Sequence, residues 1–319
     1  MNILVTGSCG FIGSHICEKL LNNNFNVIGI DNFNSDIYDN KHKYQNLIIL
    51  ENYKNYLNIS NDILNDNYII KYNPDVIIHL AGYANVRKSN IIPEKFIRNN
   101  IEVTTKILNE MKQLKNKPLL IYASSSSVYG ENKKIPFNEL DNLENIVSIY
   151  ALSKKICEDI VNMYCKTYNI KAIGLRFFTV YGPRCRPDMA TYIFLNNIKN
   201  ENSIDLYGDG TIRRDFTYID DIVDGIYNCI FYNISDGIHK IYNLGNNYPI
   251  SMNNFINICE TIIGKKALIN KKDPLIEDVS ITYADITNAK KDLNYNPKTS
   301  IEDGLQKTYN WILNNDLYF

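Results

Sequence analysis

Short apolar runs recur along the first 180 residues and alternate with longer segments of helical character. A helix-length segment, Phe11–Leu21, separates the first two runs, and apolar residues recur at three- and four-residue steps over Asn100–Leu114 and Ala151–Tyr168. The runs are Asn2–Thr6, Asn26–Ile30, Leu47–Leu50, Asp75–Gly82, Pro118–Ser124 and Lys171–Phe177. Continuous apolar strands are typical of a sheet buried on both faces, so this alternation predicts an α/β fold with a doubly wound parallel sheet.

The pattern changes near Tyr181, where shorter elements are joined by Gly, Pro and Asp turns. We therefore expect two parts, residues 1–180 and a smaller C-terminal α/β lobe over residues 181–319, with the chain crossing between them. The last helix is predicted within "TSIEDGLQKTYNWILNN", where Ser300 and Asp303 have the spacing of a capping box.

Composition narrows the possible partners. The 319 residues carry a formal net charge of −1 with both signs interspersed, which argues against binding to nucleic acid or to an anionic membrane. The opening "MNILVTG" lacks a basic region, and no apolar stretch approaches the roughly 20 residues that span a bilayer. Seven scattered cysteines and four unpaired histidines favour free thiols in a reducing cytoplasm and no protein-built metal site.

A glycine-rich segment, "VTGSCGFIG", joins the first run to the first helix and contains Gly7, Gly10 and Gly13. A tight turn and the close approach of a pyrophosphate leave no room for Cβ atoms, and the helix start supplies N–H donors. Asp31 follows the second run, where a carboxylate accepts the adenosine ribose hydroxyls and repels a 2′-phosphate. The segment predicts a Rossmann-type site for NAD rather than NADP. A plain glycine-rich turn and a solvated Asp31 are the alternatives.

Four serines, Ser124–Ser127, follow the apolar run that ends the fifth predicted strand. Tyr150 and Lys154 lie four residues apart on a predicted helix, so their side chains share one face. A lysine ammonium beside a phenol lowers the pKa of the phenol, which suits a general base, and a serine hydroxyl can share the substrate oxygen. The alternatives are a serine-rich loop and a chance Tyr-x-x-x-Lys among 24 tyrosines.

Together these segments resemble the extended short-chain dehydrogenases/reductases of the nucleotide-sugar epimerase/dehydratase family, nearest to the UDP-glucuronate 4-epimerases. The resemblance covers essentially the whole chain. Its carriers are "VTGSCGFIG", "DVIIHLAG", "SSSSVYG", "YALSK", "LRFFTVYGPRCRPDMA", "RRDFTYIDDIVDGI" and "YADITNAKKDLNYNP".

The resemblance implies a role for each matching residue. Ser125, Tyr150 and Lys154 would be catalytic, with Ser126 and Ser127 facing the sugar near C5 and C6. Residues implied to bind the cofactor are Gly7, Gly10, Phe11, Ile12, Gly13, Asp31, Asn32, Asn58, Ile59, Leu80, Ala81, Asn100, Tyr150 and Lys154. Residues implied to bind the UDP-sugar are Arg87, Thr179, Arg186 and Arg214; the alternative for Arg214 is a salt bridge to Asp215 or Asp220. Relatives also dimerise through the helices that correspond to Asn100–Leu114 and Ala151–Tyr168, which implies a homodimer.

Departures from the family pattern decide between reactions. Common 4,6-dehydratases have an Asp-Glu pair where this chain has Ser126 and Ser127, so a 4-epimerase working through a transient 4-keto sugar is favoured. The alternatives are a UDP-hexose 4,6-dehydratase, for example on UDP-N-acetylglucosamine and with inversion at C5, and a non-catalytic dinucleotide-sensing protein. Asn58 stands where relatives have the Asp of an Asp-Ile pair near the adenine. Lys88 is unusual within "AGYANVRKS" and is interpreted as a surface charge or an extra base.

Overall fold

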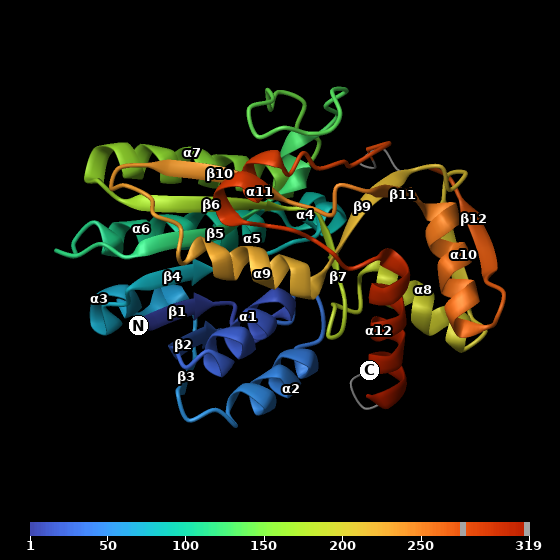
Figure 1. The fold of residues 1–319 in the computed structure, drawn as a ribbon, viewed down its shortest axis with the longest axis horizontal. Coiled ribbons are helices and arrows are strands. Elements are labelled where there is room, and N and C mark those ends of the chain that lie inside the picture. Colours follow the sequence, from blue (N-terminus) through green and yellow to red (C-terminus); the bar gives the residue numbers. More distant parts are fainter. Residues whose placement is uncertain (275–278, 316–319) are drawn as a thin grey trace.

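The computed structural model describes residues 1–274 and 279–315, and its largest element is a seven-stranded sheet (Figure 1). The strands lie in the order β10-β6-β5-β4-β1-β2-β3, and every neighbouring pair is parallel. Their bounds are β1 Asn2–Thr6, β2 Asn26–Asp31, β3 Tyr56–Ser60, β4 Val76–His79, β5 Leu119–Ser125, β6 Lys171–Phe177 and β10 His239–Leu244. The predicted parallel sheet is confirmed.

Helices cover both faces of this sheet, because alternate side chains of each strand point to opposite sides. Ile3 and Val5 of β1 belong to the apolar cluster that contains residues of α1 and α9, whereas Leu4 belongs to the cluster of α6 and α7. These helices are α1 Phe11–Asn22, α9 Ile219–Cys229, α6 Val103–Met111 and α7 Ile149–Tyr168. The sheet is therefore doubly wound, as predicted.

One predicted strand is wrong. Leu47–Leu50 forms the last turn of helix α2, Lys41–Leu50, and β3 lies further along the chain at Tyr56–Ser60. A run of four apolar residues is too short to separate a strand from a buried helix turn. The edge strand β3 was missed because its side chains are only partly buried and include Asn58 and Ser60.

The predicted helices agree with the structure apart from their ends. The segment Asn100–Leu114 begins earlier, as a π-helix at Ile97–Glu102 that continues into α6. The final helix, α12 Ile301–Asn314, is capped by Ser300, whose Oγ accepts a hydrogen bond from the N–H of Asp303 at 3.1 Å.

Residues from β7 onward build a second group of elements, on the right of Figure 1. Two small sheets, β11-β9-β7 and β12-β8, pack with three helices. The elements are β7 Thr179–Tyr181, α8 Ala190–Lys199, β8 Ser203–Tyr207, β9 Arg213–Tyr218, β11 Pro249–Ser251, α10 Met252–Ile263, β12 Leu268–Lys272 and α12. The chain also returns to the large sheet through α9 and β10. A boundary at residue 180 stays a prediction.

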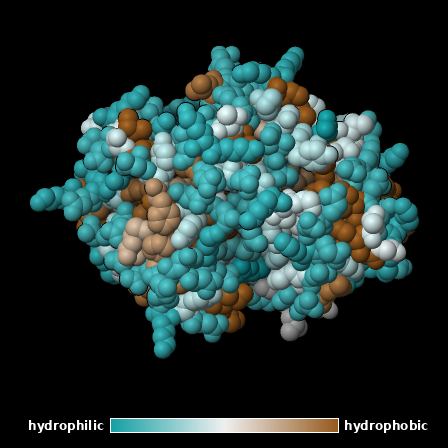
Figure 2. Space-filling view, in the orientation of Figure 1, coloured by the Kyte–Doolittle hydropathy of each residue, from teal (hydrophilic) through white to brown (hydrophobic). Residues whose placement is uncertain are grey.

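Polar side chains cover most of the face drawn in Figure 2, and the apolar ones form separate patches. Among the helices of residues 1–274 and 279–315, none has the length and apolar character that a membrane crossing requires.

Burial lowers the pKa of all four histidines. The pKa falls to about 4 for His42 and His239 and to about 3 for His79, and the pKa of His15 lies well below its usual range. As the pH drops below about 6.5, the unfolded chain takes up protons that the folded chain resists, so the free energy of unfolding falls. Burial raises the pKa of Asp215 to about 6, so protonation of this carboxyl adds to the free energy of unfolding as the pH falls and offsets part of the loss. We expect the melting temperature to fall between pH 7 and pH 5.

A second measurement uses the variant His239→Gln, which removes one titrating imidazole. Its amide can keep the hydrogen bond to the Tyr122 hydroxyl, which is 2.8 Å from His239 in the native protein. This variant should lose less stability over the same pH range, as measured by thermal unfolding. Equal melting temperatures of the native protein at pH 7 and pH 5 would contradict the prediction.

Candidate active site

The glycine-rich turn after β1 packs backbone directly against backbone. Gly7 has a φ of +68°, and a Cβ on Gly13 would lie 1.9 Å from the carbonyl oxygen of Gly7. Helix α1 begins at Phe11, so the free N–H groups of its first turn face this turn. Glycines leave room for a pyrophosphate to approach the backbone closely, and the free N–H groups at the start of α1 can donate to it.

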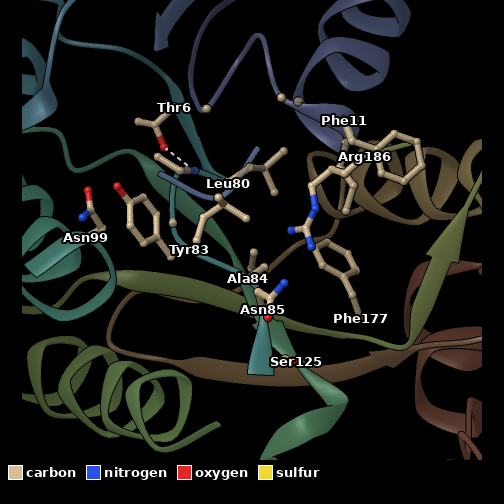
Figure 3. A pocket seen from close by; sticks show the side chains of 18 of the residues that line it. Thr6, Phe11, Leu80, Tyr83, Ala84, Asn85, Asn99, Ser125, Phe177 and Arg186 are labelled. Carbon is tan, nitrogen blue, oxygen red and sulfur yellow. Dashed lines mark hydrogen bonds between the residues drawn. The ribbon is translucent and has the colours of Figure 1, made fainter. Parts of the chain in front are cut away.

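This turn forms one wall of a cavity of about 410 Å³ (Figure 3). The other walls come from the carboxyl ends of β2, β4 and β5, from the start of α7 and from residues at and after β7. Because β1 lies between β2 and β4, the cavity sits where the strand order reverses, which is where doubly wound sheets bind ligands.

Most residues predicted to bind the cofactor line this cavity. They are Gly7, Gly10, Phe11, Ile12, Gly13, Asp31, Asn32, Leu80, Ala81, Tyr150 and Lys154. The other three predicted cofactor residues do not belong to the described lining of the cavity: Asn58, Ile59 and Asn100.

Asp31 is buried at the end of β2, and both of its carboxylate oxygens already accept hydrogen bonds from the protein. Oδ1 accepts from the N–H of Phe33 at 2.9 Å and from Lys43 Nζ at 3.2 Å, and Oδ2 accepts from the N–H of Cys9 at 3.2 Å. These bonds fix the carboxylate at the cavity wall, where it is placed to accept further hydrogen bonds from a ribose.

The assignment near the adenine needs a correction. Asn58 and Ile59 lie within β3, and Asn58 Nδ2 donates to Ser60 Oγ at 2.9 Å. Asp62 and Ile63 line the cavity instead, and Asp62 accepts from Asn32 Nδ2 at 3.3 Å. Since the cavity lies beyond the carboxyl ends of the strands, only residues that follow β3 reach it. The sequence carries this signal as the Asp-Ile pair itself, four residues after the position we assigned.

Asn100 supports the cavity wall from behind. Its Oδ1 accepts from the N–H of Tyr83 at 2.7 Å, and its Nδ2 donates to the carbonyl of Tyr83 at 3.1 Å and to Ser153 Oγ at 2.9 Å. The residue lies in the π-helix at Ile97–Glu102, a local distortion that is frequent at functional sites. Asn100 therefore joins the segment after β4 to helix α7.

The three residues predicted to be catalytic meet in the cavity. Ser125 ends β5, and both its hydroxyl and the phenol of Tyr150, from the first turn of α7, line the cavity. Ser125 Oγ donates to Ser127 Oγ at 3.2 Å. Lys154 extends from the next turn and donates from Nζ to the carbonyl of Ala123 at 2.9 Å. A Cβ on Gly82 would lie 3.4 Å from the Lys154 ammonium, so this charge faces the segment after β4.

The pKa shift of Tyr150 is opposite to the lowering that was predicted from Lys154. Burial raises the pKa of the phenol, while the nearby Ser125 hydroxyl and the charge of Arg186 act to lower it. Burial also lowers the pKa of Lys154. The ammonium of Lys154 donates to the Ala123 carbonyl at 2.9 Å, although Lys154 and Tyr150 share one helix face.

Behind the site, Glu158 and Arg176 form a buried ion pair between α7 and β6. Arg176 Nε and Nη2 donate to the two Glu158 oxygens at 2.9 and 2.8 Å. Ser124 Oγ also donates to Glu158 at 2.6 Å, and Arg176 Nη1 donates to the Tyr129 hydroxyl at 2.9 Å. Ser124 thus supports the strand end, and it lines the cavity together with Ser125, Ser126 and Ser127.

Two of the four predicted substrate residues, Thr179 and Arg186, line the cavity, and Figure 3 shows the Arg186 guanidinium extending into it. Arg186 donates from Nε and Nη2 to Asp188 at 2.9 and 3.1 Å, and Asn85 Nδ2 donates to the same carboxylate at 2.9 Å. Burial works against the charge of Arg186, and nearby Asp188 raises its pKa. The cavity therefore holds a positive group beside Ser125 and Tyr150.

The other two arginines do not belong to the described cavity lining. Arg87 lies over the ring of Tyr207, 4.6 Å from its centroid. Arg214 Nη1 donates to the carbonyls of Val279 and Arg213 at 2.7 and 3.0 Å. Its neighbour Asp215 instead accepts backbone N–H groups of residues 246, 247 and 284.

Lys88 fits neither interpretation made from the sequence. Its Nζ donates to the carbonyls of Ile37 and Asp36 at 2.5 and 3.3 Å, so it contacts the loop after β2. Several other lining residues could not be predicted from the sequence, because their contacts depend on how the segments after β2 and β7 fold over the cavity. They are Asn34, Ile37, Tyr38, Lys43 and Met189.

A model of the NAD dependent epimerase/dehydratase family matches residues 3–245. The chain belongs to this family. It is 39% identical to protein CapI of Staphylococcus aureus, over 98% of each chain. It is 37% identical to UDP-glucuronate 4-epimerase 3 of Arabidopsis thaliana, over 98% of this chain and 76% of that protein. A crystal structure of UDP-glucuronic acid 4-epimerase from Bacillus cereus, in complex with UDP-glucuronic acid and NAD, matches with a TM-score of 0.92 and 36% identity, over 98% of this chain and 99% of the other.

Membership of the epimerase/dehydratase family confirms the resemblance and the expected cofactor, NAD. The cavity fits this dinucleotide on its own evidence, because the glycine turn accommodates a pyrophosphate and the Asp31 carboxylate lies where an adenosine ribose would follow. Lys154 and Tyr150 then lie at the opposite end, beyond β4.

Glu158→Gln should destabilise the apoprotein by about 3–5 kcal/mol, because it leaves the buried Arg176 charge without its partner. The matched control is Asp159→Asn on the same helix, where the Lys155–Asp159 pair has an Asp side chain 65% exposed. Loss of such a surface pair should cost less than about 1 kcal/mol. Urea unfolding measures both variants, and equal free energies of unfolding would contradict the prediction.

Proposed function

We propose that this chain is an NAD-dependent UDP-sugar 4-epimerase that interconverts UDP-glucuronate and its C4 epimer. The observation that carries the proposal is that Ser125, Tyr150 and Lys154 line the same cavity as the glycine turn. A general base and a hydroxyl donor thus lie together beside a dinucleotide site, which is the equipment for oxidising a secondary alcohol.

The side chains of this site have defined tasks in such a reaction. Ser125 and Tyr150 would bind the 4-hydroxyl of the sugar, and Tyr150 would take its proton and later return it. NAD, when bound, accepts a hydride from C4 and gives it back. Lys154 adds a positive charge near the same end of the cavity. Return of the hydride to the opposite face of the 4-keto sugar inverts C4, and the net reaction is neither an oxidation nor a reduction.

The position of Arg186 favours a uronate as the sugar. Its guanidinium enters the cavity beside the serines at the end of β5, and a guanidinium fork suits a carboxylate. Asp188 binds two of its nitrogens and orients the group. Ser126 and Ser127 add hydroxyl groups where we expect C5 and C6, and Thr179 is placed to meet the nucleotide diphosphate. Two curated or crystallised relatives are UDP-glucuronate 4-epimerases by name.

A 4,6-dehydratase receives no support from the cavity. Dehydration needs an acid and a base near C5 and C6, but the acidic side chains among the described lining residues are Asp31 and Asp62. Asp31 ends β2 and Asp62 follows β3, so both lie on the β2–β3 side of the sheet, away from Ser125 at the end of β5.

We also propose that two copies associate through α7 and the helix that runs from the π-helix into α6, the elements that contain most of the predicted Ala151–Tyr168 and Asn100–Leu114. Large apolar side chains on these helices are exposed, with Ile97 at 51%, Leu152 at 42% and Met163 at 47%. Pairing of two helices from each copy would bury them in a four-helix bundle. A cytoplasmic, reducing compartment is proposed as well, because all seven cysteines are buried free thiols.

The expected reaction can be followed by NMR of the anomeric protons after mixing the enzyme with UDP-glucuronate, UDP-glucose or UDP-N-acetylglucosamine. We expect conversion of UDP-glucuronate to the C4 epimer, with no deuterium entering C5 from heavy water. A 4-keto-6-deoxy product with deuterium at C5 would instead identify a dehydratase. Bound NAD without conversion of any of the three sugars would refute the proposed activity.

Tyr150→Phe should lower the rate of epimerisation about 10²–10⁴-fold while NAD stays bound, because the general base is lost. Tyr164→Phe on the same helix is the control, since its hydroxyl donates to Asn109 Oδ1 outside the cavity lining. Initial rates and NAD content should be measured on both variants. An unchanged rate in Tyr150→Phe would support a dinucleotide-sensing role instead.

A further inference from the structure

The loop over residues 32–40, which follows β2, covers part of the cavity. Asn32, Asn34, Ile37 and Tyr38 of this loop line the cavity between the glycine turn and the substrate side. Tyr38 lies near both the cofactor side and the substrate side of the cavity: its ring centroid is 5.9 Å from Lys43 Nζ and 5.9 Å from the Arg186 guanidinium. We name this segment the cofactor loop. It has no strand or helix hydrogen bonds over residues 32–39 to hold its carbonyl groups.

Lys88 supplies partners for two of these carbonyls. It lies on the short helix α4, Val86–Ile91, and its ammonium donates to Ile37 O at 2.5 Å and to Asp36 O at 3.3 Å. An ammonium has three donors and no acceptor, so it can hold two carbonyls at once. Because Ile37 lines the cavity, fixing its carbonyl also fixes its side chain against the cofactor site.

Tyr83 holds the same loop from the segment after β4. Its hydroxyl donates to Asp36 Oδ2 at 2.6 Å, and its ring belongs to an apolar cluster with Ile37, Phe96 and Tyr150. The backbone of Tyr83 is itself held on both sides by Asn100. The cofactor loop is thereby connected to the helix that carries Tyr150.

We propose that Lys88 and Tyr83 are positioning residues that hold the cofactor loop over bound NAD and slow its release. This proposal rests on the proposed function for its purpose, because an epimerase must keep the hydride that it has removed until the 4-keto sugar has turned. Release of the cofactor at that stage would leave the sugar oxidised. The role differs from that of a catalytic base, since Lys88 is outside the described cavity lining and donates to peptide carbonyls.

The test measures NAD release directly, without any sugar. Purified holoenzyme carrying radiolabelled NAD is diluted into excess unlabelled NAD, and retained label is followed by filter binding. Lys88→Met keeps the aliphatic stem and removes the charge; we expect about tenfold faster release, the size that corresponds to losing one hydrogen bond to a charged group. Tyr83→Phe should also release NAD faster, and it carries the test if Lys88→Met does not fold.

Lys155→Met is the matched control, because Lys155 is paired with Asp159 on the surface of α7 and should leave release unchanged. Hydrogen exchange of the holoenzymes adds a readout that a general loss of stability would not give: exchange should rise in residues 32–40 and not in β5 or β6. Release rates within twofold of the native protein in both Lys88→Met and Tyr83→Phe would overturn the proposal. Faster release in an enzyme that converts no UDP-sugar would support the loop assignment and refute only the proposed activity.

Discussion

The buried ion pair between Glu158 and Arg176 determines whether the proposed catalytic groups can meet. Glu158 lies one turn after Lys154 on α7, and Arg176 lies on β6 beside the strand that ends in Ser125. Ser124 donates to the carboxylate, and Tyr129 connects Arg176 to Asn243 of β10 by hydrogen bonds of 2.9 and 2.7 Å. A bidentate pair has little angular freedom. It therefore sets the rotation and height of α7 against the sheet, and with them the distance between a phenol and a serine hydroxyl.

Much of the fold could be predicted from the sequence because the determining patterns are local. Continuous apolar runs identified most strands of the large sheet, and the glycine spacing located the cofactor turn. Leu47–Leu50 was misassigned because its four residues satisfy both a strand and the end of a helix, and only packing against the rest of the sheet decides between them. The edge strand β3 has too few buried side chains to give a strong signal.

The site was predictable where a side chain follows directly from a strand or helix end, as for Ser125 and Tyr150. It was not predictable where a long side chain can reach several partners. Arg87 and Arg214 have the chemistry to bind phosphate, yet they contact an aromatic ring and peptide carbonyls in the second lobe. Lys88 stood out as unusual in the sequence, but its direction depends on a loop residue, Ile37, that is 51 residues away in the chain.

The contact between Lys43 and Asp31 has a consequence for the choice between the two nicotinamide dinucleotides. Lys43 is largely buried in the cavity wall, and its ammonium lies 3.2 Å from the carboxylate that faces the ribose. The Asp31 carboxylate disfavours a phosphorylated ribose, while the Lys43 ammonium lies next to that carboxylate. The barrier against NADP thus depends on a single carboxylate. A neutral amide in its place would expose a cation already in position to attract the extra phosphate.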